Sequence, residues 1–226
     1  QNFQRNEAAS KEMNTAHGGK LINLLSMGER AAQLAAEARA LPVVRLNPFE
    51  LSDLEMLAIG GFSPLEGFLT RADYESVVRD MRLANGLPWS LPITLAVTAE
   101  AAGQLRGHAC VALADGEGEP LAVMFVEDVF TCDREAEARA VFRTTETKHP
   151  GVAYLASRGE WLMGGRIEVF RRPSDGNFAK YRLDPADTRR IFAERGWQTI
   201  VGFQTRNVPH TWHEDMQKTD LGLVDG

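Results

Sequence analysis

Apolar positions near the start of this chain follow a helical period. They recur at helical spacing over residues 27–40, a run rich in helix formers, and predict an amphipathic helix there. A short strand is predicted over residues 43–46. The next helix is expected after Asn47-Pro48, with Ser52 as its N-cap and Glu55 three positions later as partner in a capping box.

The middle of the chain changes to short apolar runs separated by turn residues, which is typical of strands. Strands are predicted over residues 91–97, 109–113, 121–126 and 165–170. A turn at residues 115–118 joins the second and third of these as a hairpin. Helices are predicted over residues 73–84 and 134–143. Short strands with interposed helices predict a compact, β-rich α+β domain.

The last part of the chain follows a loop or linker at residues 173–177 and has a different order of elements. Asp184-Pro185 supplies an N-cap and a proline at the first helical position, and Gly196 suits the C-terminal cap of that helix. Residues 199–203 are apolar and bounded by turn signals, which predicts a buried strand of a parallel sheet. A polar loop and a second helix follow.

Composition and charge narrow the class of protein. The 226 residues are 44% hydrophobic and carry a net charge of -6, which excludes a disordered tail or a fibre and predicts one large or two small domains. The acidity argues against nucleic acid as a partner, because such binding needs clustered Lys and Arg. No apolar run approaches the roughly 20 residues that span a bilayer, so no membrane partner is expected.

Two further features bear on location. Cys110 and Cys132 lie in unrelated contexts without a CxxC pair, which favours reduced thiols in a cytoplasmic protein over a disulfide. Residues 1–20 are polar and lack the apolar core of a secretory signal, so they are expected to form a mobile N-terminal arm.

The loop over residues 204–209 is the most informative stretch of the chain. It follows the predicted buried strand and precedes a helix predicted over residues 211–221, a place where α/β sheets bind ligands. The free N–H groups and the dipole of a helix N-terminus favour anions. Arg206 offers a planar fork of donors for an oxyanion, and Gln204 and Asn207 add neutral donors.

His210 and His213 are three residues apart, so both face one side of the first helical turn. Two imidazoles there can donate to phosphate oxygens. An HxxH pair alone is also compatible with a weak metal site, but zinc needs three or four ligands. The other histidines, His17, His108 and His149, have no spacing that would mark them as further ligands of such a site. The combination of strand, QxRN loop, proline and HxxH helix is more specific than any of its parts.

This stretch, QTRNVPHTWHE, resembles the signature of the ATP sulfurylase (sulfate adenylyltransferase) family. Similar family segments extend through most of the chain, at residues 17–21, 60–68, 81–94, 149–152 and 184–203. The resemblance implies a PUA-like, β-rich domain over residues 21–175. It further implies the start of a Rossmann-like adenylyltransferase domain over residues 176–226, so that an α+β part precedes an α/β part.

The resemblance also implies roles for individual residues. Those in sulfate- and nucleotide-binding positions are Gln204, Thr205, Arg206 and Asn207. His210 and His213 would contact the phosphates of ATP and stabilise the transition state, so that Arg206, His210 and His213 are the catalytic candidates. The reaction implied is ATP plus sulfate giving adenosine 5′-phosphosulfate (APS) and pyrophosphate, or its reverse. Mg²⁺ would arrive with the nucleotide, and neither a protein metal site nor an organic cofactor is expected.

The resemblance leaves several alternatives open. Trp212 replaces a small residue of the family motif, and its indole would either pack against the rest of the protein or block the phosphate site. A downstream adenosine-binding segment of the family does not follow here, so the 226 residues are expected to be part of a longer chain and inactive alone. Such chains can carry an APS kinase domain and form homo-oligomers. The alternative function is a non-catalytic sulfurylase-like module, and the PUA-like part makes RNA binding a weaker alternative.

Overall fold

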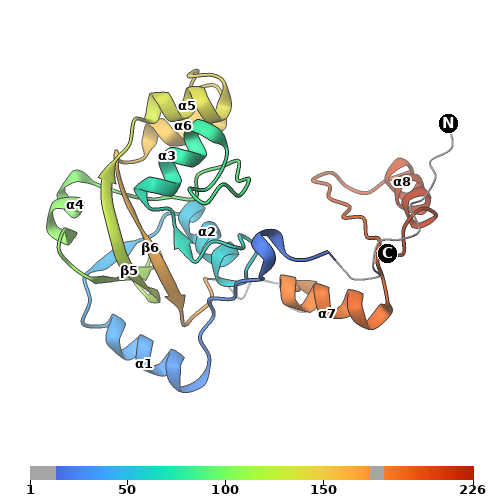
Figure 1. The fold of residues 1–226 in the computed structure, drawn as a ribbon, viewed down its shortest axis with the longest axis horizontal. Helices are drawn as coiled ribbons and strands as arrows, with labels where there is room; N and C mark the ends of the chain where they lie inside the picture. The colour runs from blue at the N-terminus through green and yellow to red at the C-terminus, as the bar shows by residue number, and fades with distance from the viewer. Residues whose placement is uncertain (1–13, 174–180) are drawn as a thin grey trace.

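A mixed sheet forms the centre of the larger part of the molecule, on the left of Figure 1. The computed structural model describes residues 14–173 and 181–226. The six strands follow the order β1-β4-β5-β6-β2, with β3 also paired to β6. Their bounds are Val43–Arg45 (β1), Gly67–Phe68 (β2), Leu95–Val97 (β3), Cys110–Ala114 (β4), Pro120–Thr131 (β5) and Trp161–Val169 (β6). The β1–β4 pair is parallel and the other pairs are antiparallel.

Strands β5 and β6 form the long spine of this sheet. Their register runs from Ala122 opposite Val169 to Thr131 opposite Trp161, with a bulge between Val126 and Asp128. Gly165 lies beside this bulge with a φ of 149°, and a Cβ there would approach the Phe125 carbonyl oxygen to 2.0 Å. Only glycine fits such a close approach of backbones. Because β5 occupies one edge of β6, β2 and β3 share the other edge.

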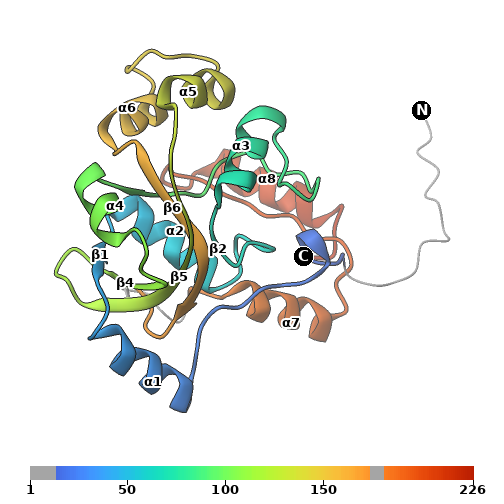
Figure 2. The ribbon, with the colours of Figure 1, turned by 60° about the vertical axis from the view of Figure 1, so that its left-hand side comes forward.

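Helices cover both faces of the sheet (Figures 1 and 2). Their bounds are Gly28–Ala38 (α1), Pro48–Ala58 (α2), Arg71–Asp80 (α3), Ala99–Leu105 (α4), Arg134–Phe142 (α5) and Pro150–Ser157 (α6), after a short 3-10 turn at His17–Gly19. On one face, Leu34 of α1 packs with Ala112 and Val123. The main core lies on the other face, where Leu54 of α2 and neighbouring strand residues such as Leu113 are fully buried. Successive residues of a strand point to opposite faces of the sheet and so pack into different core clusters.

The end of the chain forms a separate, exposed part (Figure 1). It contains α7 (Pro185–Arg195) and α8 (Thr211–Leu221), and neither helix has a buried residue. Asp184 is the N-cap of α7 and Gly196 its left-handed C-terminal residue, which confirms both predicted ends. No helix in the described part of the chain is both long and apolar enough to cross a membrane.

Two local predictions were wrong. Helix α2 is capped by Asn47 and not by Ser52, since the Asn47 side chain accepts from the N–H groups of Phe49 (2.9 Å) and Glu50 (3.0 Å). Residues 199–203 do not form a buried strand: Ile200 and Val201 are 38% and 40% exposed. A parallel strand needs neighbours on both edges. In the described residues this segment instead has backbone bonds to the chain end, from Val201 N to Gly226 O and from Asp225 N to Thr199 O, each 3.0 Å.

Most predicted elements are present within a few residues of their predicted bounds, including the β4–β5 hairpin. The short elements β2, α4 and α6 were not predicted. The proposed boundary at residues 175–176, and residues 1–13 of the predicted arm, lie outside the described residues. Within residues 14–20, the His17 side chain donates to the Pro88 carbonyl at 2.8 Å.

Candidate functional site

The loop predicted to carry the chemistry leads directly into α8. His210 is the N-cap of this helix, and Thr211 is its first residue. The His210 N–H donates to Nδ1 of His213 at 3.2 Å, as the third helical residue of a capping box does. Because Nδ1 of His213 accepts this bond, the proton of the neutral ring is assigned to Nε2. Nε2 is then a donor that can point at a ligand.

The two imidazoles lie together, as predicted from their spacing. Their ring centroids are 4.0 Å apart, and Phe203 meets the His213 ring edge-on at 5.8 Å. They line a cavity of about 230 Å³ at the start of α8, whose walls are Pro209, His210, Thr211, His213, Glu214 and Gln217. Among the described residues, no group of three His, Cys, Asp or Glu side chains is placed to hold a metal ion.

Glu214 and Gln217 were not predicted as site residues. They stand four and seven positions after His210, and helical periodicity puts all of them on one face. That spacing was a signal in the sequence that could have identified them. The Glu214 carboxylate pairs with Lys218 at 2.6 Å, so part of its charge is neutralised on the helix surface.

The remaining predicted residues lie on the loop before the cavity and do not line it. Gln204, Arg206 and Asn207 are exposed, and Thr205 is half-buried. The Thr205 hydroxyl accepts from the Asn207 N–H at 3.1 Å and so shapes the turn. Arg206 makes no hydrogen bond or ion pair with any other described residue. Its guanidinium donors are therefore available to an anion.

Asp225 holds the segment that leads into this loop, and the sequence analysis did not identify it. One carboxylate oxygen of Asp225 accepts from the N–H groups of Gln198 and Thr199 and from the Thr199 hydroxyl, each at 2.9 Å. These bonds join the approach to the loop to the residues that follow α8. The loop and the helix are thereby closed into one unit.

Trp212 was expected either to pack against the rest of the protein or to block the phosphate site. Its side chain is 69% exposed, so it does not pack against the other described residues. It is also absent from the walls of the 230 Å³ cavity. Successive residues of an α-helix are about 100° apart, so Trp212 stands off the face that His210 and His213 share, and no described element covers it there.

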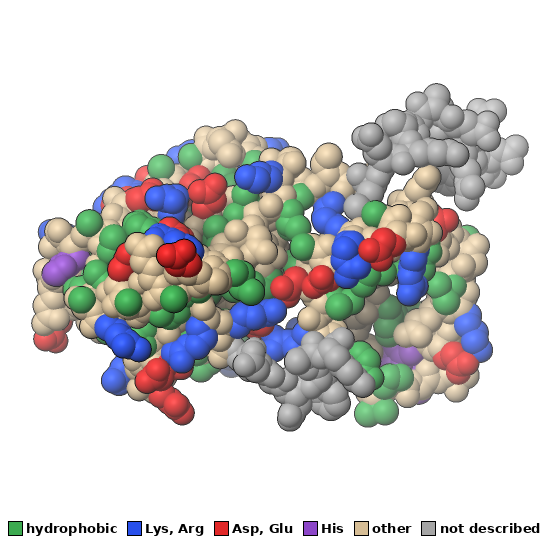
Figure 3. Space-filling model, turned by 90° about the horizontal axis from the view of Figure 1, so that it is seen from below, with side chains coloured by type: hydrophobic (Ala, Val, Ile, Leu, Met, Phe, Trp, Pro, Cys, Tyr) green, Lys and Arg blue, Asp and Glu red, His purple; other side chains and the backbone are tan. Residues whose placement is uncertain are grey.

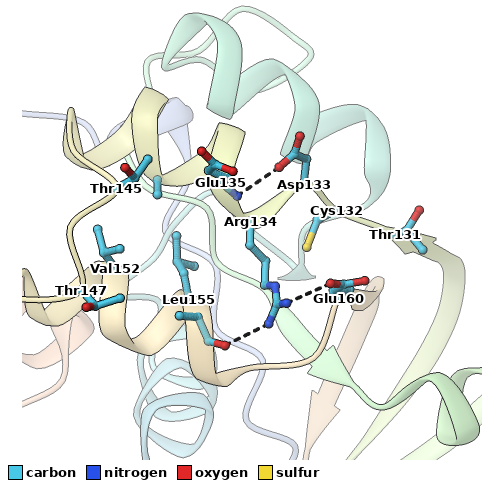
Figure 4. Close-up of a pocket in the computed structure, with 12 residues that line it drawn as sticks. Thr131, Cys132, Asp133, Arg134, Glu135, Thr145, Thr147, Val152, Leu155 and Glu160 are labelled. Atoms are coloured by element: carbon cyan, nitrogen blue, oxygen red, sulfur yellow. Dashed lines mark hydrogen bonds and ion pairs between the residues drawn. The ribbon is translucent and has the colours of Figure 1, made fainter.

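A larger cavity lies elsewhere, in the sheet domain (Figure 4). It holds about 680 Å³ between α5, α6 and the end of β5. Each charged group in its walls already has a partner. Arg134 donates to the Ala156 and Arg158 carbonyls and to Glu160, Asp133 caps α5, and Glu135 pairs with Arg139. Arg134 thereby holds the start of α5 against the end of α6, and none of the predicted site residues lies here.

A buried polar network lies under this cavity. Arg158 and Glu137 form an ion pair, the Tyr74 hydroxyl donates to Glu137 at 2.7 Å, and Arg158 donates to Thr94 at 2.8 Å. Burial raises the pKa of the Glu137 carboxyl. Burial and the nearby Glu137 charge together raise the pKa of the Tyr74 hydroxyl. The network fixes α3, α5 and α6 to the sheet. Both cysteines are free, in agreement with the predicted thiols.

By fold and site, the chain is a β-rich α+β domain followed by a loop-and-helix segment that presents donors suited to an anion. The model of the PUA-like domain family matches residues 14–172, and that of the ATP-sulfurylase family matches residues 179–225. Over most of its length the chain therefore belongs to the PUA-like domain family, and its last part matches the ATP-sulfurylase family. The fold class and the family resemblance predicted from the sequence are confirmed.

Several relatives cover 93% of this chain. A "Probable bifunctional SAT/APS kinase 2" of Sorangium cellulosum is 52% identical, and 36% of its length is matched. A "Sulfate adenylyltransferase" of Synechococcus sp. (strain JA-3-3Ab) is 48% identical, with 53% matched. The solved structure "Hexameric APS kinase from Thiobacillus denitrificans" is 31% identical with a TM-score of 0.73, and 38% of it is matched. The chain thus spans about half the length of these relatives, or less.

Proposed function

We propose that the protein carrying this chain is a sulfate adenylyltransferase, which forms APS and pyrophosphate from ATP and sulfate or runs the reverse reaction. The observation that carries the proposal is the pairing of His210 and His213 in a cavity at the start of α8. This pair lies within the segment matched by the sulfurylase family. The names of the relatives give the proposal its reaction.

In this proposal, the histidines donate to phosphate oxygens of ATP, helped by the dipole of α8. Arg206 binds the sulfate dianion, and Gln204, Thr205 and Asn207 add neutral contacts to sulfate and nucleotide. A sulfate oxygen attacks the α-phosphorus, a new P–O–S link forms, and the bond to the bridging oxygen of pyrophosphate breaks. Both substrates are anions, so the protein positions them and spreads the developing charge. Mg²⁺ enters bound to the phosphates of ATP.

The larger organisation of the protein is also proposed. We divide the chain into an N-terminal arm at residues 1–20, the PUA-like domain at 21–175 and the catalytic part from 176. The relative from Sorangium supports a fused APS kinase domain, and the hexameric neighbour supports a homo-oligomer. The two free thiols fit a reducing compartment, and we place the protein in the cytoplasm.

A chimera tests this function and the role of Arg206 together. The matching stretch of the Synechococcus relative is replaced by this chain, and sulfate-dependent exchange of pyrophosphate into ATP is measured. The chimera should be active. Arg206→Ala should lower kcat/KM for sulfate by about 10- to 100-fold, because a charge-assisted hydrogen bond is worth roughly 1.5–3 kcal/mol. Arg206→Lys keeps the charge and should retain more activity.

Arg190→Ala is the matched control, since Arg190 pairs only with Asp187 and Glu194 on the surface of α7 among the described residues. Full exchange activity in folded Arg206→Ala would refute the sulfate-binding role. A folded chimera without any exchange activity would favour the non-catalytic module.

A further inference from the structure

Four charged side chains join the PUA-like domain to the segment that carries the histidines. Arg172, which follows β6, contacts Glu55 of α2 at 3.4 Å and Asp184 at 3.0 Å. Glu55 also accepts from Arg182 at 2.7 Å. The order Arg182, Glu55, Arg172, Asp184 alternates positive and negative charge. Two members belong to the PUA-like domain, and two stand just before α7. We call these four residues the junction network.

The junction network is better shielded than most ion pairs of this chain. The Glu55 and Asp184 carboxylates are 16% and 21% exposed, whereas the surface pairs of α7 and α8 are 46% exposed or more. Isolated surface pairs contribute little, but partly buried networks of several charges contribute more. In Figure 3, acidic and basic side chains lie next to one another where the two parts of the molecule meet.

No apolar core crosses this junction within the described residues. The core clusters and the hydrophobic residues packed against them end at Phe170. A further side-chain contact at the junction, from Arg189 of α7 to the carbonyl of Asn14 at 2.8 Å, is also polar. Parts of a chain that share no hydrophobic interface move relative to one another by default. The orientation of α7 therefore depends on charged and polar contacts.

The junction network is linked to the histidine loop by a short, braced path. Asp184 is both a member of the network and the N-cap of α7. At the other end of α7, Phe192 stacks on Trp197, with centroids 5.9 Å apart, and Arg195 lies over the same indole. The next residues are those held by Asp225. A change in direction at Asp184 would therefore move the loop and α8 along with α7.

We propose that the junction network positions the histidine loop relative to the PUA-like domain. Glu55 and Arg172 are positioning residues, because they act on the loop through Asp184 and α7 and touch no predicted substrate position. The effect of the junction network on the reaction rests on the proposed function. Its effect on the orientation of the histidine loop does not. Because the contacts are ionic, salt should weaken them, and at about 1 M the screening length falls to about 3 Å.

Pulsed EPR on the 226-residue chain tests the orientation directly. Cys110 and Cys132 are changed to Ala, and spin labels are placed at two exposed positions, Ala36→Cys on α1 and Asp215→Cys on α8. The parent should give a narrow distance distribution at low salt. Glu55→Gln should broaden it, as should 1 M salt in the parent. Glu55→Asp should restore most of the narrow distribution, and Arg190→Gln should leave it unchanged.

The activity of the Synechococcus chimera supplies the second readout. Glu55→Gln should lower kcat several-fold, with recovery in Glu55→Asp. An unchanged distance distribution in Glu55→Gln would overturn the proposal, whatever the activity. A broadened distribution with unchanged kcat in an active chimera would overturn the positioning role. A broadened distribution in the 226-residue chain, together with a folded chimera that never shows exchange, would support the orientation role and refute the proposed function instead.

Discussion

Asp53 is a half-buried carboxylate on α2 that has neither a hydrogen bond nor an ion pair with another described residue. Burial, and secondarily the charge of Glu50, raise its pKa from 3.8 to about 6. Glu50 is itself buried and accepts from the N–H groups of Asn47 and Ala96, and the Tyr154 hydroxyl lies near both carboxylates. The ionised form of Asp53 therefore costs folding free energy at neutral pH.

Replacing Asp53 should stabilise the protein at neutral pH. Between about pH 4 and pH 6 the folded chain holds the Asp53 proton more tightly than the unfolded chain does. The contribution of Asp53 to the unfolding free energy therefore falls as the pH rises through this range. Asp53→Asn removes this loss and should gain up to about 3 kcal/mol at pH 7. The gain should shrink towards pH 4 in urea titrations. The exposed carboxylate Glu66, changed to Gln, is the control. A variant less stable than its parent at pH 7 would show that Asp53 has a favourable partner.

At this scale, sequence reasoning identified side chains on regular elements and missed those that depend on tertiary contacts. The spacing of His210 and His213 was sufficient to predict that they share a helix face, and they do. The anchoring role of Asp225 depends on the chain returning to Gln198 and Thr199, which no local pattern encodes. Whether the Trp212 side chain is covered likewise depends on which segment packs beside α8, and no local pattern encodes that either.

The start of α2 shows how two equally good local signals compete. Asn47 and Ser52 are each followed by Glu three residues later, and both match a capping box. The structure uses Asn47, where Pro48 occupies the first helical position and needs no N–H partner. Glu50 completes the box by accepting from the Asn47 N–H at 2.9 Å. Proline at the first position was the sequence feature that decided between them.

A pair of substitutions tests this choice. Asn47→Ala should lower the unfolding free energy by about 1 kcal/mol, because two N–H groups at the start of α2 lose their acceptor. Ser52→Ala, at an exposed position inside the helix, should change it little. Asn47→Asp keeps the acceptor and should be milder than Asn47→Ala. Urea titrations of the three variants measure the differences, and equal losses in both alanine variants would contradict the observed cap.

The apolar run at residues 199–203 marks the limit of pattern reasoning for whole elements. The β4–β5 hairpin was predicted correctly because its two strands are close in sequence and joined by a recognisable turn. A buried parallel strand depends on neighbours that come from distant segments. In the described chain those neighbours do not stand beside residues 199–203, which remain exposed.

At the scale of the whole molecule, burial is divided very unevenly. Every described residue that is fully buried precedes Phe170, while α7 and α8 contain none. Helices of 11 residues are marginal in water unless packing supports them. Burial of apolar surface is the main favourable term in folding, so the PUA-like domain should hold nearly all of the stability of the chain.

A truncated chain of residues 14–172 should consequently fold alone. It should unfold cooperatively in urea, with a midpoint close to that of the same transition in the 226-residue chain, because it keeps all three core clusters.

In hydrogen exchange of the 226-residue chain, amides of β5 and β6 should be protected longest. Those of α8 should exchange by local opening well before the sheet unfolds. Trp197 lies outside the PUA-like domain and stacks on Phe192. With Trp89, Trp161 and Trp212 changed to Phe, the fluorescence of Trp197 should change at lower urea than the sheet signal in circular dichroism. If both signals changed together, or if residues 14–172 failed to fold, the terminal segment would have to contribute to the core through contacts other than those of its described residues.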